Sequence, residues 1–155
     1  MVISNRRKKA RVICVSALAI CLSACESLGF GGHPLSGTYW RLAVVDKDGV
    51  QSRLNESLQS RHTISFSFDG RIQMQLDCNQ GTGSWSAQQP EYVDEAQRGS
   101  IAISPIAATR AYCPEPSFGE QMAADLPMSG SFRINPDGNR LVLRGGSTRY
   151  VFRRD

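Results

Sequence analysis

The clearest feature of the chain is a regular alternation of apolar and polar residues between positions 62 and 77. The apolar positions are Ile64, Phe66, Phe68, Ile72, Met74 and Leu76. Asp69-Gly70 stands at the middle of the pattern, and this dipeptide favours a two-residue hairpin turn. Because successive side chains of a strand point to opposite faces of its sheet, the pattern predicts a hairpin with one buried face and one wet face.

The same period of two predicts six further short strands, separated by turns rich in Gly, Pro and Asp. They cover residues 38–45, 82–87, 99–104, 131–135, 140–144 and 147–153. In the first of them Trp40, Leu42 and Val44 share one face, and the last three follow one another as a meander. Residues 88–98 are expected to form a polar loop, whereas residues 51–61 fit a short helical turn and a loop equally well.

One segment, residues 117–126, has the pattern of a helix. Its apolar side chains fall on one stripe at a spacing of four. They are Phe118, Met122 and Leu126. Ser117 and Glu120 fit the S-x-x-E capping box, and Pro127 is expected to end the helix. About eight short strands and one helix predict a mainly antiparallel β (α+β) fold, a strongly bent sheet or small barrel with the helix packed across it.

The N-terminus has the pattern of a secretory signal. Basic residues at positions 6–11 precede an apolar run over residues 12–22, which is shorter than the roughly 20 residues of a membrane-spanning helix. The run ends in Leu22-Ser23-Ala24-Cys25, which resembles the lipobox of bacterial lipoproteins. That resemblance implies lipidation of Cys25, cleavage before it and several acyl chains that would anchor the protein stably in a membrane. Glu26 after the cysteine favours the outer membrane, with the domain in the periplasm.

These patterns divide the chain into three parts. Residues 1–24 are the signal peptide, residues 25–36 are the lipidated cysteine with a flexible tether, and residues 37–155 are one domain. The net charge of +4 depends on the signal, which holds five of the 18 basic residues. The mature chain keeps 13 basic against 14 acidic residues, a net charge of −1, and has no basic cluster apart from Arg153-Arg154. We therefore expect no binding to nucleic acid.

The cysteines predict one covalent link inside the domain. Cys14 and Cys21 leave with the signal, and Cys25 carries lipid. Cys78 and Cys113 remain, and the oxidising cell envelope favours a disulfide between them. The alternative is a metal site or a redox pair, but the chain has no C-x-x-C motif to support it.

Short motifs follow one another in a characteristic order along the domain. In chain order they are Trp40-Arg41-Leu42, Asp77-Cys78-Asn79 with Gly81, Thr109 four residues before Cys113, Glu120 in the helix, and Leu141-Val142-Leu143. In their order and spacing, residues 37–152 resemble the META/HslJ domain family. Asp77 stands where that family usually has Gly, and Ala111-Tyr112 stand where a methionine is common. The resemblance implies a compact β-rich fold, often attached to the bacterial envelope as a lipoprotein, with no defined biochemical activity.

The residues that could carry catalysis have simpler structural interpretations. The mature chain holds two histidines, His33 in the tether and His62 at the start of a strand, and no G-x-S-x-G motif. Among the carboxylates, Asp77 is expected to face solvent or lie at a turn, Glu120 to cap the helix, and Asp125 to occupy an ordinary helix position. We therefore expect no enzyme activity, no catalytic residue, no metal and no cofactor.

Three further side chains bear on binding. We interpret Trp40 and Trp85 as core residues rather than a face for stacking a ligand, and Arg110 as a surface or structural residue rather than an anion site. The prediction is a non-enzymatic, lipid-anchored envelope protein that supports envelope integrity or stress tolerance through contacts with a periplasmic or outer-membrane protein. One alternative is a periplasmic inhibitor of a protease or lysozyme, acting through an exposed rigid loop or an N-terminal arm. Another is a carrier of a small apolar ligand, which needs an open pocket beside the two tryptophans.

Overall fold

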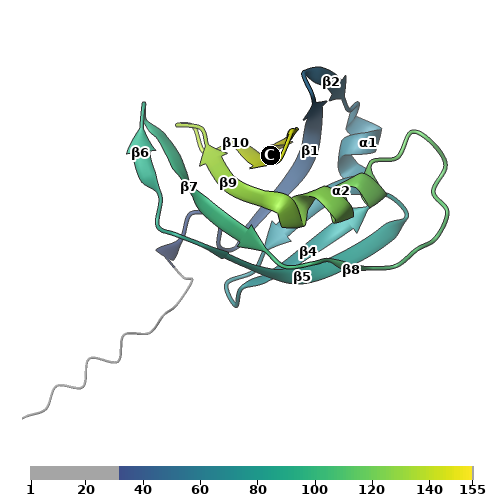
Figure 1. Cartoon of the computed structure of the whole chain (residues 1–155), viewed down its shortest axis with the longest axis horizontal. Coiled ribbons are helices and arrows are strands. Elements are labelled where there is room, and N and C mark those ends of the chain that lie inside the picture. The colour runs from purple at the N-terminus through teal and green to yellow at the C-terminus, as the bar shows by residue number, and fades with distance from the viewer. Residues whose placement is uncertain (1–31, 155) are drawn as a thin grey trace, which may run out of the picture.

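The computed structural model describes residues 32–154, so the predicted signal peptide, Cys25 and most of the tether lie outside the described residues. The described chain is mainly antiparallel β (Figure 1). Its strands are β1 (Thr38–Lys47), β2 (Val50–Arg53), β3 (His62–Phe66), β4 (Arg71–Leu76), β5 (Asn79–Ala87), β6 (Glu91–Val93), β7 (Ala96–Ile103), β8 (Ala107–Ala108), β9 (Ser129–Ile134), β10 (Arg140–Gly145) and β11 (Thr148–Arg153). Its helices are α1 (Glu56–Arg61), α2 (Gly119–Asp125) and the 3-10 turn η2 (Leu126–Met128). Within residues 32–154, every helix is too short or too polar to cross a membrane.

Eight of the strands close into a barrel. Their order is β7-β9-β10-β11-β1-β3-β4-β5, and β5 pairs with β7 to complete the ring. The three remaining strands attach to this ring, β2 to β1, β6 to β7 and β8 to β5. The predicted small antiparallel barrel is confirmed, and so is the meander, which is β9-β10-β11. The closed ring and its core lie within residues 33–154, so this segment is a folding unit of its own.

The barrel bends at β1, which pairs with different strands along its length. Its first four residues pair with β3 and its last four with β2. The register with β11 shifts between Leu42 and Val44, which leaves Ala43 as the extra residue of a β-bulge. The carbonyl of Ala43 accepts the N–H of Leu54 over 2.9 Å. Because a bulge bends and twists its strand, it allows β1 to leave one neighbour and join another.

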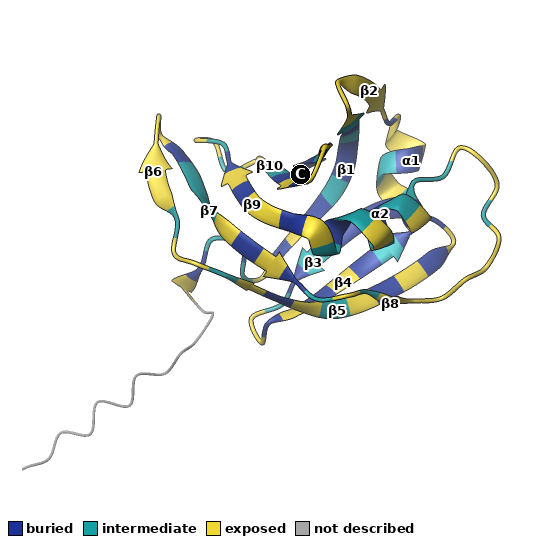
Figure 2. Ribbon diagram, in the orientation of Figure 1, coloured by how far each residue is buried: buried dark blue, intermediate teal, exposed yellow. Residues whose placement is uncertain are grey.

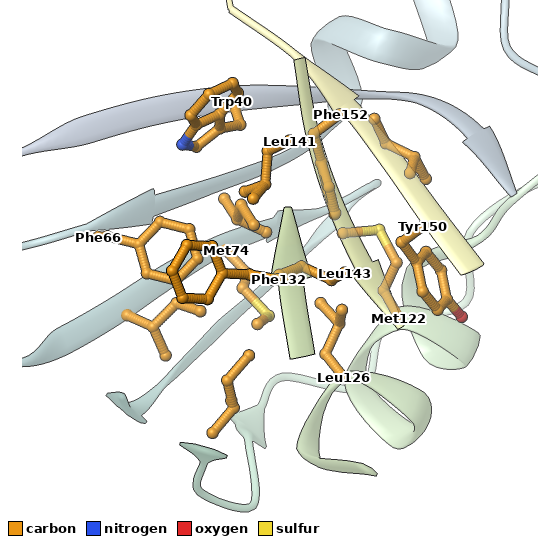
Figure 3. Packing of buried hydrophobic residues seen from close by; sticks show 14 of the residues in the cluster. Trp40, Phe66, Met74, Met122, Leu126, Phe132, Leu141, Leu143, Tyr150 and Phe152 are labelled. Carbon is orange, nitrogen blue, oxygen red and sulfur yellow. The ribbon is translucent and has the colours of Figure 1, made fainter. Parts of the chain in front are cut away.

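The inward side chains of the strands form one apolar core. Buried and exposed residues alternate along the barrel strands, as the predicted period of two requires (Figure 2). Aromatic rings and leucines from opposite walls meet in the middle of the barrel (Figure 3). Trp40 is fully buried and Trp85 is 3 % exposed, which confirms that both belong to the core. Side chains therefore fill the space in which an apolar ligand carrier would hold its ligand.

Two expectations about the strands were wrong. Phe68 was predicted to point inward, but it lies in the turn between β3 and β4 and is 63 % exposed. The N–H of Ser67 pairs with the carbonyl of Arg71, so the turn is longer than the Asp69-Gly70 dipeptide suggests. Residues 88–98 were predicted as a loop, but they contain the hairpin of β6 and the start of β7. All of β6 is exposed, so its sequence lacks the apolar alternation that reveals a strand.

For residues 51–61 the sequence fitted a short helical turn and a loop equally well, and the structure shows a helix there. This segment contains β2 and then α1. Asn55 caps α1, because its side chain accepts the backbone N–H of Leu58 over 3.0 Å. Leu58 is the buried residue of α1, so the helix adds one apolar side chain to the core.

The second helix begins later than predicted, and the predicted capping box between Ser117 and Glu120 does not form. The N-cap residue of α2 is Phe118, which has no side-chain cap. The N–H of Ser117 instead meets the carboxylate of Glu115 over 3.0 Å. Pro127 does not end the helical segment either, since the chain continues from α2 into η2, which contains this proline.

The domain begins earlier than predicted. His33 and Leu35, which we placed in the tether, are 6 % and 0 % exposed. The imidazole of His33 packs edge-on against the rings of Trp85 and Phe132. Its Nε2 lies 3.0 Å from the carbonyl oxygen of Gln88. The start of the described chain is therefore fixed between β5 and β9, so residues 33–36 belong to the folded domain and not to the predicted tether.

Candidate functional site

The motif residues that follow β4 gather where the chain between β8 and α2 is fastened to the barrel. Cys78 lies in the turn between β4 and β5 and is joined to Cys113, 35 residues further along the chain. The predicted disulfide is thus confirmed. We call residues 109–117 the disulfide loop. In Figure 1 it is the long excursion between β8 and α2, on the side of the barrel opposite β6.

The side chain of Asn79 fastens the same loop by hydrogen bonds. Its Oδ1 accepts the backbone N–H of Ala111 over 2.7 Å and the hydroxyl of Thr109 over 3.0 Å. Its Nδ2 donates to the carbonyl of Ala111 over 2.8 Å. Asn79 is 6 % exposed. A carboxamide can meet both the donor and the acceptor of one peptide backbone, which explains why an amide residue occupies this motif position.

Thr109 and Gly81 complete the contact between the loop and β5. The backbone N–H of Thr109 donates to the carbonyl of Gln80, and the hydroxyl of Thr109 accepts the N–H of Gln80, both over 3.0 Å. A Cβ atom at Gly81 would lie 2.7 Å from Ile106 and 2.8 Å from Leu76. The glycine therefore allows the chain around Ile106 to lie directly on β5.

We expected Asp77 either to face solvent or to lie at a turn. It lies at a turn and is buried. It is 4 % exposed, and its carboxylate forms an ion pair with the guanidinium of Arg61 at 2.5 Å. Its φ of 64° lies in the left-handed region. Glycine reaches this region without strain, and aspartate is among the residues that tolerate it. The backbone shape that a glycine would supply is thus present here, and the carboxylate adds the ion pair.

His62 is a buried structural residue. Its Nδ1 lies 2.7 Å from the carbonyl of Leu58, and its Nε2 accepts the backbone N–H of Phe118 over 3.0 Å. Burial is the main cause that lowers the pKa of this imidazole below its ordinary value. Both ring nitrogens have backbone partners, so His62 holds α1, β3 and the start of α2 together rather than acting on a substrate.

The outer part of the disulfide loop is open to solvent. Tyr112 lies between the anchored residues Ala111 and Cys113, and it is 89 % exposed, more than any other large hydrophobic residue of the described chain. A groove of about 390 Å³ separates the loop from α2, and its walls carry Arg110 and Glu120. The loop therefore offers an aromatic ring and a cation on a backbone that the disulfide and Asn79 hold in place, and α2 adds an anion across the groove.

The three candidate carboxylates serve different parts of the fold. Asp77 pairs with Arg61, Asp125 accepts the hydroxyl of Tyr150 over 2.8 Å, and Glu120 lies at the groove beside the loop. Burial, followed by the hydrogen bond to Asp125, raises the pKa of Tyr150. In the part of the chain that the structure describes, no group of three or more His, Cys, Asp or Glu side chains could hold a metal ion.

The first motif lies in the barrel wall, apart from the disulfide loop. Trp40 and Leu42 are both fully buried. The indole N–H of Trp40 donates to the hydroxyl of Thr38 over 2.7 Å, and the guanidinium of Arg154 lies 4.7 Å from the centre of the Trp40 ring. These motif residues support the core, whereas the Asn79 and Thr109 motifs position a loop.

A family match covers the described domain. The model of the META domain matches residues 33–155. The chain belongs to the META domain family. The match begins at His33, the residue at which the buried part of the chain also begins. Among solved structures, a DUF4847 family protein from Bacteroides vulgatus ATCC 8482 has a similar fold, with a TM-score of 0.52, 13 % sequence identity, and coverage of 78 % of this chain and 94 % of that chain. The comparison with curated proteins gives no match.

Sequence reasoning missed two features of this META domain. The first is the exposed ring of Tyr112. The sequence pointed to it only indirectly, because Tyr112 lies in a segment that is bracketed by prolines and carries a cysteine of the disulfide. The second is the ion pair between Arg61 and Asp77. No sequence pattern indicated it, because α1 could not be distinguished from a loop and the partners stand 16 residues apart.

Proposed function

We propose that this protein is a non-enzymatic, lipid-anchored envelope protein whose META domain binds another protein through the disulfide loop. The main support for the proposal is that Tyr112 is exposed on a backbone that the disulfide holds in place. Tyrosine and arginine are enriched at the centres of protein interfaces, and the loop presents both at Tyr112 and Arg110. Because the loop is already held at Asn79 and Cys113, binding a partner would cost little additional conformational entropy.

The roles of the polar side chains support a binding function over catalysis. His62 uses both ring nitrogens for backbone contacts, Asp77 is paired with Arg61, and Asn79 uses its whole carboxamide to hold the loop. Each of these groups has a defined partner in the fold, and the one carboxylate oxygen of Asp77 without a hydrogen bond is buried, whereas a general base needs a free lone pair directed at a substrate.

The test of the partner contact is site-specific crosslinking in intact cells. A photoreactive amino acid replaces Tyr112 in one variant of the full chain and Tyr92 in the control, where the ring is 73 % exposed on β6. We expect a discrete crosslinked protein from position 112 and none from position 92. The pair of substitutions Cys78→Ser and Cys113→Ser should reduce the product, since the loop loses its covalent fastening. The same crosslinks from both positions would contradict the proposal.

The lipid anchor has its own test. The sequence motif that ends at Cys25 supports an anchor in the outer membrane, with the domain in the periplasm. Cys25→Ala should move the protein from the membrane fraction to the soluble periplasmic fraction and remove labelling by a fatty-acid probe. A variant that still fractionates with membranes and still takes up the probe would rule out this anchor.

Inhibition of a periplasmic protease or lysozyme is a second candidate, because an inhibitor must present an exposed and rigid loop. The disulfide loop with Tyr112 at its exposed part has this form. Titration of purified protein against lysozymes and periplasmic proteases should then give stoichiometric inhibition that Tyr112→Ala abolishes and Tyr92→Ala leaves intact. Full enzyme activity at a large excess of the protein would exclude inhibition of those enzymes.

A further inference from the structure

A second surface of the domain carries a cluster of arginines that is not visible as a run in the sequence. Five arginines line one groove of about 670 Å³ on the outer face of β7, β9, β10 and β11. They are Arg98, Arg133, Arg140, Arg144 and Arg149. We call this surface the arginine face. It corrects the expectation that the mature chain has no basic cluster apart from Arg153-Arg154, because strand register, rather than sequence position, assembles it.

The register places like charges directly opposite one another. Arg98 is the cross-strand partner of Arg133, and Arg144 is the partner of Arg149. At the edge of the face, Arg140 stands opposite Arg153. Directly opposed like charges destabilise a sheet. An anion that bridges the two members of a pair would remove this repulsion.

Few carboxylates compensate these charges. Arg149 has a good partner, since its Nη2 lies 2.7 Å from Oδ2 of Asp46. Arg98 lies 3.7 Å from Asp94, whose side chain is 85 % exposed, so solvent screens this pair strongly. For Arg133, Arg140 and Arg144, the described chain offers no acidic partner within salt-bridge distance. The face therefore keeps a positive charge in a domain with little net charge.

The chemistry of the face fits phosphate groups. A guanidinium presents a rigid fork of N–H donors that binds phosphate through two hydrogen bonds. Two adjacent guanidinium pairs fit a surface that presents several phosphates, as a bilayer containing anionic phospholipids does. The small polar side chains of Ser131 and Asn135 lie in the same groove and leave room for headgroups.

The start of the described chain packs against the core side of β9, the strand that carries Arg133 on its outer side. His33 packs against Phe132, which stands between Ser131 and Arg133 in β9. Gly32 stands seven positions after Cys25, which is a distance of at most roughly 25 Å at full extension. An anchor at Cys25 would thus keep the start of the domain, which packs against β5 and β9, near the membrane. The disulfide loop lies on the side of the barrel opposite β6, where it would point into the periplasm (Figure 1).

We propose that the arginine face binds the phosphate groups of anionic phospholipids in the membrane that holds the anchor, so that the domain lies on the bilayer with the disulfide loop facing outward. This inference rests on the proposed lipid anchor for the position of the membrane, but the binding itself does not require acyl chains. It can therefore be tested on the domain alone.

The experiment is vesicle flotation with the unlipidated domain, residues 32–155, which contains the whole closed barrel. One set of vesicles is phosphatidylcholine and the other is two parts phosphatidylcholine to one part phosphatidylglycerol. The test variant carries Arg133→Gln and Arg144→Gln. The matched control carries Arg53→Gln and Arg71→Gln, which change the net charge equally at exposed positions outside the face. Circular dichroism verifies that both variants are folded.

We expect binding to the anionic vesicles that salt weakens and little binding to phosphatidylcholine. The test variant should partition about 30-fold less onto anionic vesicles, at roughly 1 kcal/mol for each arginine near the surface, and the control should retain wild-type binding. Equal loss in both variants, or no binding by the wild type, would overturn the proposal. So would full displacement by millimolar inorganic pyrophosphate, since the face would then be a site for a soluble phosphate ligand. None of these failures bears on the Cys25 test, which uses the full chain in cells.

Discussion

The backbone N–H of Phe118 donates a hydrogen bond to Nε2 of His62 over 3.0 Å. On the other side of the ring, Nδ1 lies 2.7 Å from the carbonyl oxygen of Leu58. The two partners assign a neutral imidazole with its hydrogen on Nδ1, since a carbonyl can only accept and an N–H can only donate. A proton on Nε2 would point at the donor of Phe118, so the junction of α1, β3 and α2 requires neutral His62.

This requirement predicts that stability falls as the pH is lowered below about 6.5, the ordinary histidine value. Burial lowers the pKa of His62 and also that of His33. As the pH falls, the unfolded chain therefore binds protons before the folded chain does, which favours unfolding. The contribution of the neutral rings is fully present above pH 6.5 and is lost progressively below it. We expect the thermal midpoint to fall between pH 7 and about pH 5, above the range in which most carboxylates titrate.

Substitution of the histidines checks the origin of this slope. His62→Gln should lower the thermal midpoint at pH 7, because the bridge between Leu58 and Phe118 is weakened, and it should also flatten the dependence on pH. The double variant with His33→Gln should be flat between pH 7 and pH 5. Circular dichroism melts across this range measure both effects. A double variant with the wild-type slope would show that other groups cause it.

Asp77 predicts a difference between two small replacements. Its φ of 64° disfavours alanine by about 1 kcal/mol or more relative to glycine. Asp77→Gly loses the ion pair with Arg61 but keeps the backbone shape, whereas Asp77→Ala loses both. Urea unfolding should therefore show Asp77→Ala as the less stable variant. Asp48, exposed in the β1–β2 turn with a φ of 52°, provides the control, because Asp48→Gly and Asp48→Ala isolate the backbone cost. Equal stability of the two Asp77 variants would contradict this account.

The parts of the fold that the sequence predicted are those in which a local pattern and the final burial agree. Ile64 and Met74 alternate with polar residues because each strand of the barrel has one inner and one outer face. The disulfide was predictable from the number of cysteines left after Cys25. The meander followed from three short alternating segments separated by glycine turns.

The features that were missed depend on contacts between distant segments. The capping box failed because Phe118 is held by His62, and this contact sets the first turn of α2 after the serine. The arginine face arises because β7 pairs with β9, which brings Arg98 opposite Arg133 although they are 35 positions apart. No local window of the sequence contains either relationship, so only the topology of the barrel reveals them.

Asn79 and the disulfide hold the same loop, so their effects on stability should be coupled. Asn79→Ala removes the three hydrogen bonds to Thr109 and Ala111 and leaves the N–H of Ala111 without its partner, a loss of roughly 2–4 kcal/mol. In a variant with Cys78→Ser and Cys113→Ser, the same substitution should cost about 1 kcal/mol less, because the loop is then less well fixed. A double-mutant cycle by urea unfolding measures this difference. Additive losses would mean that the two fastenings act independently.

Gly119 gives the sharpest steric prediction. It begins α2 directly against β4, and a Cβ atom there would lie 2.4 Å from the carbonyl oxygen of Leu76 and 2.7 Å from its carbonyl carbon. Backbone atoms at the end of β4 cannot move without disturbing the adjacent turn of Asp77 and Cys78. Gly119→Ala should therefore destabilise the domain by about 1–3 kcal/mol, as overpacking does, even though alanine favours a helix.

Gly130 in β9 is the matched control for this substitution. A Cβ atom at Gly130 would meet nothing within 4 Å, and its φ lies outside the left-handed region. Gly130→Ala should leave stability unchanged or raise it by up to about 1 kcal/mol, since alanine restricts the unfolded chain. Denaturant unfolding of both variants makes the comparison. If Gly119→Ala were as stable as Gly130→Ala, α2 could not lie as close to β4 as the structure places it, and the anchoring of the disulfide loop between them would need a different explanation.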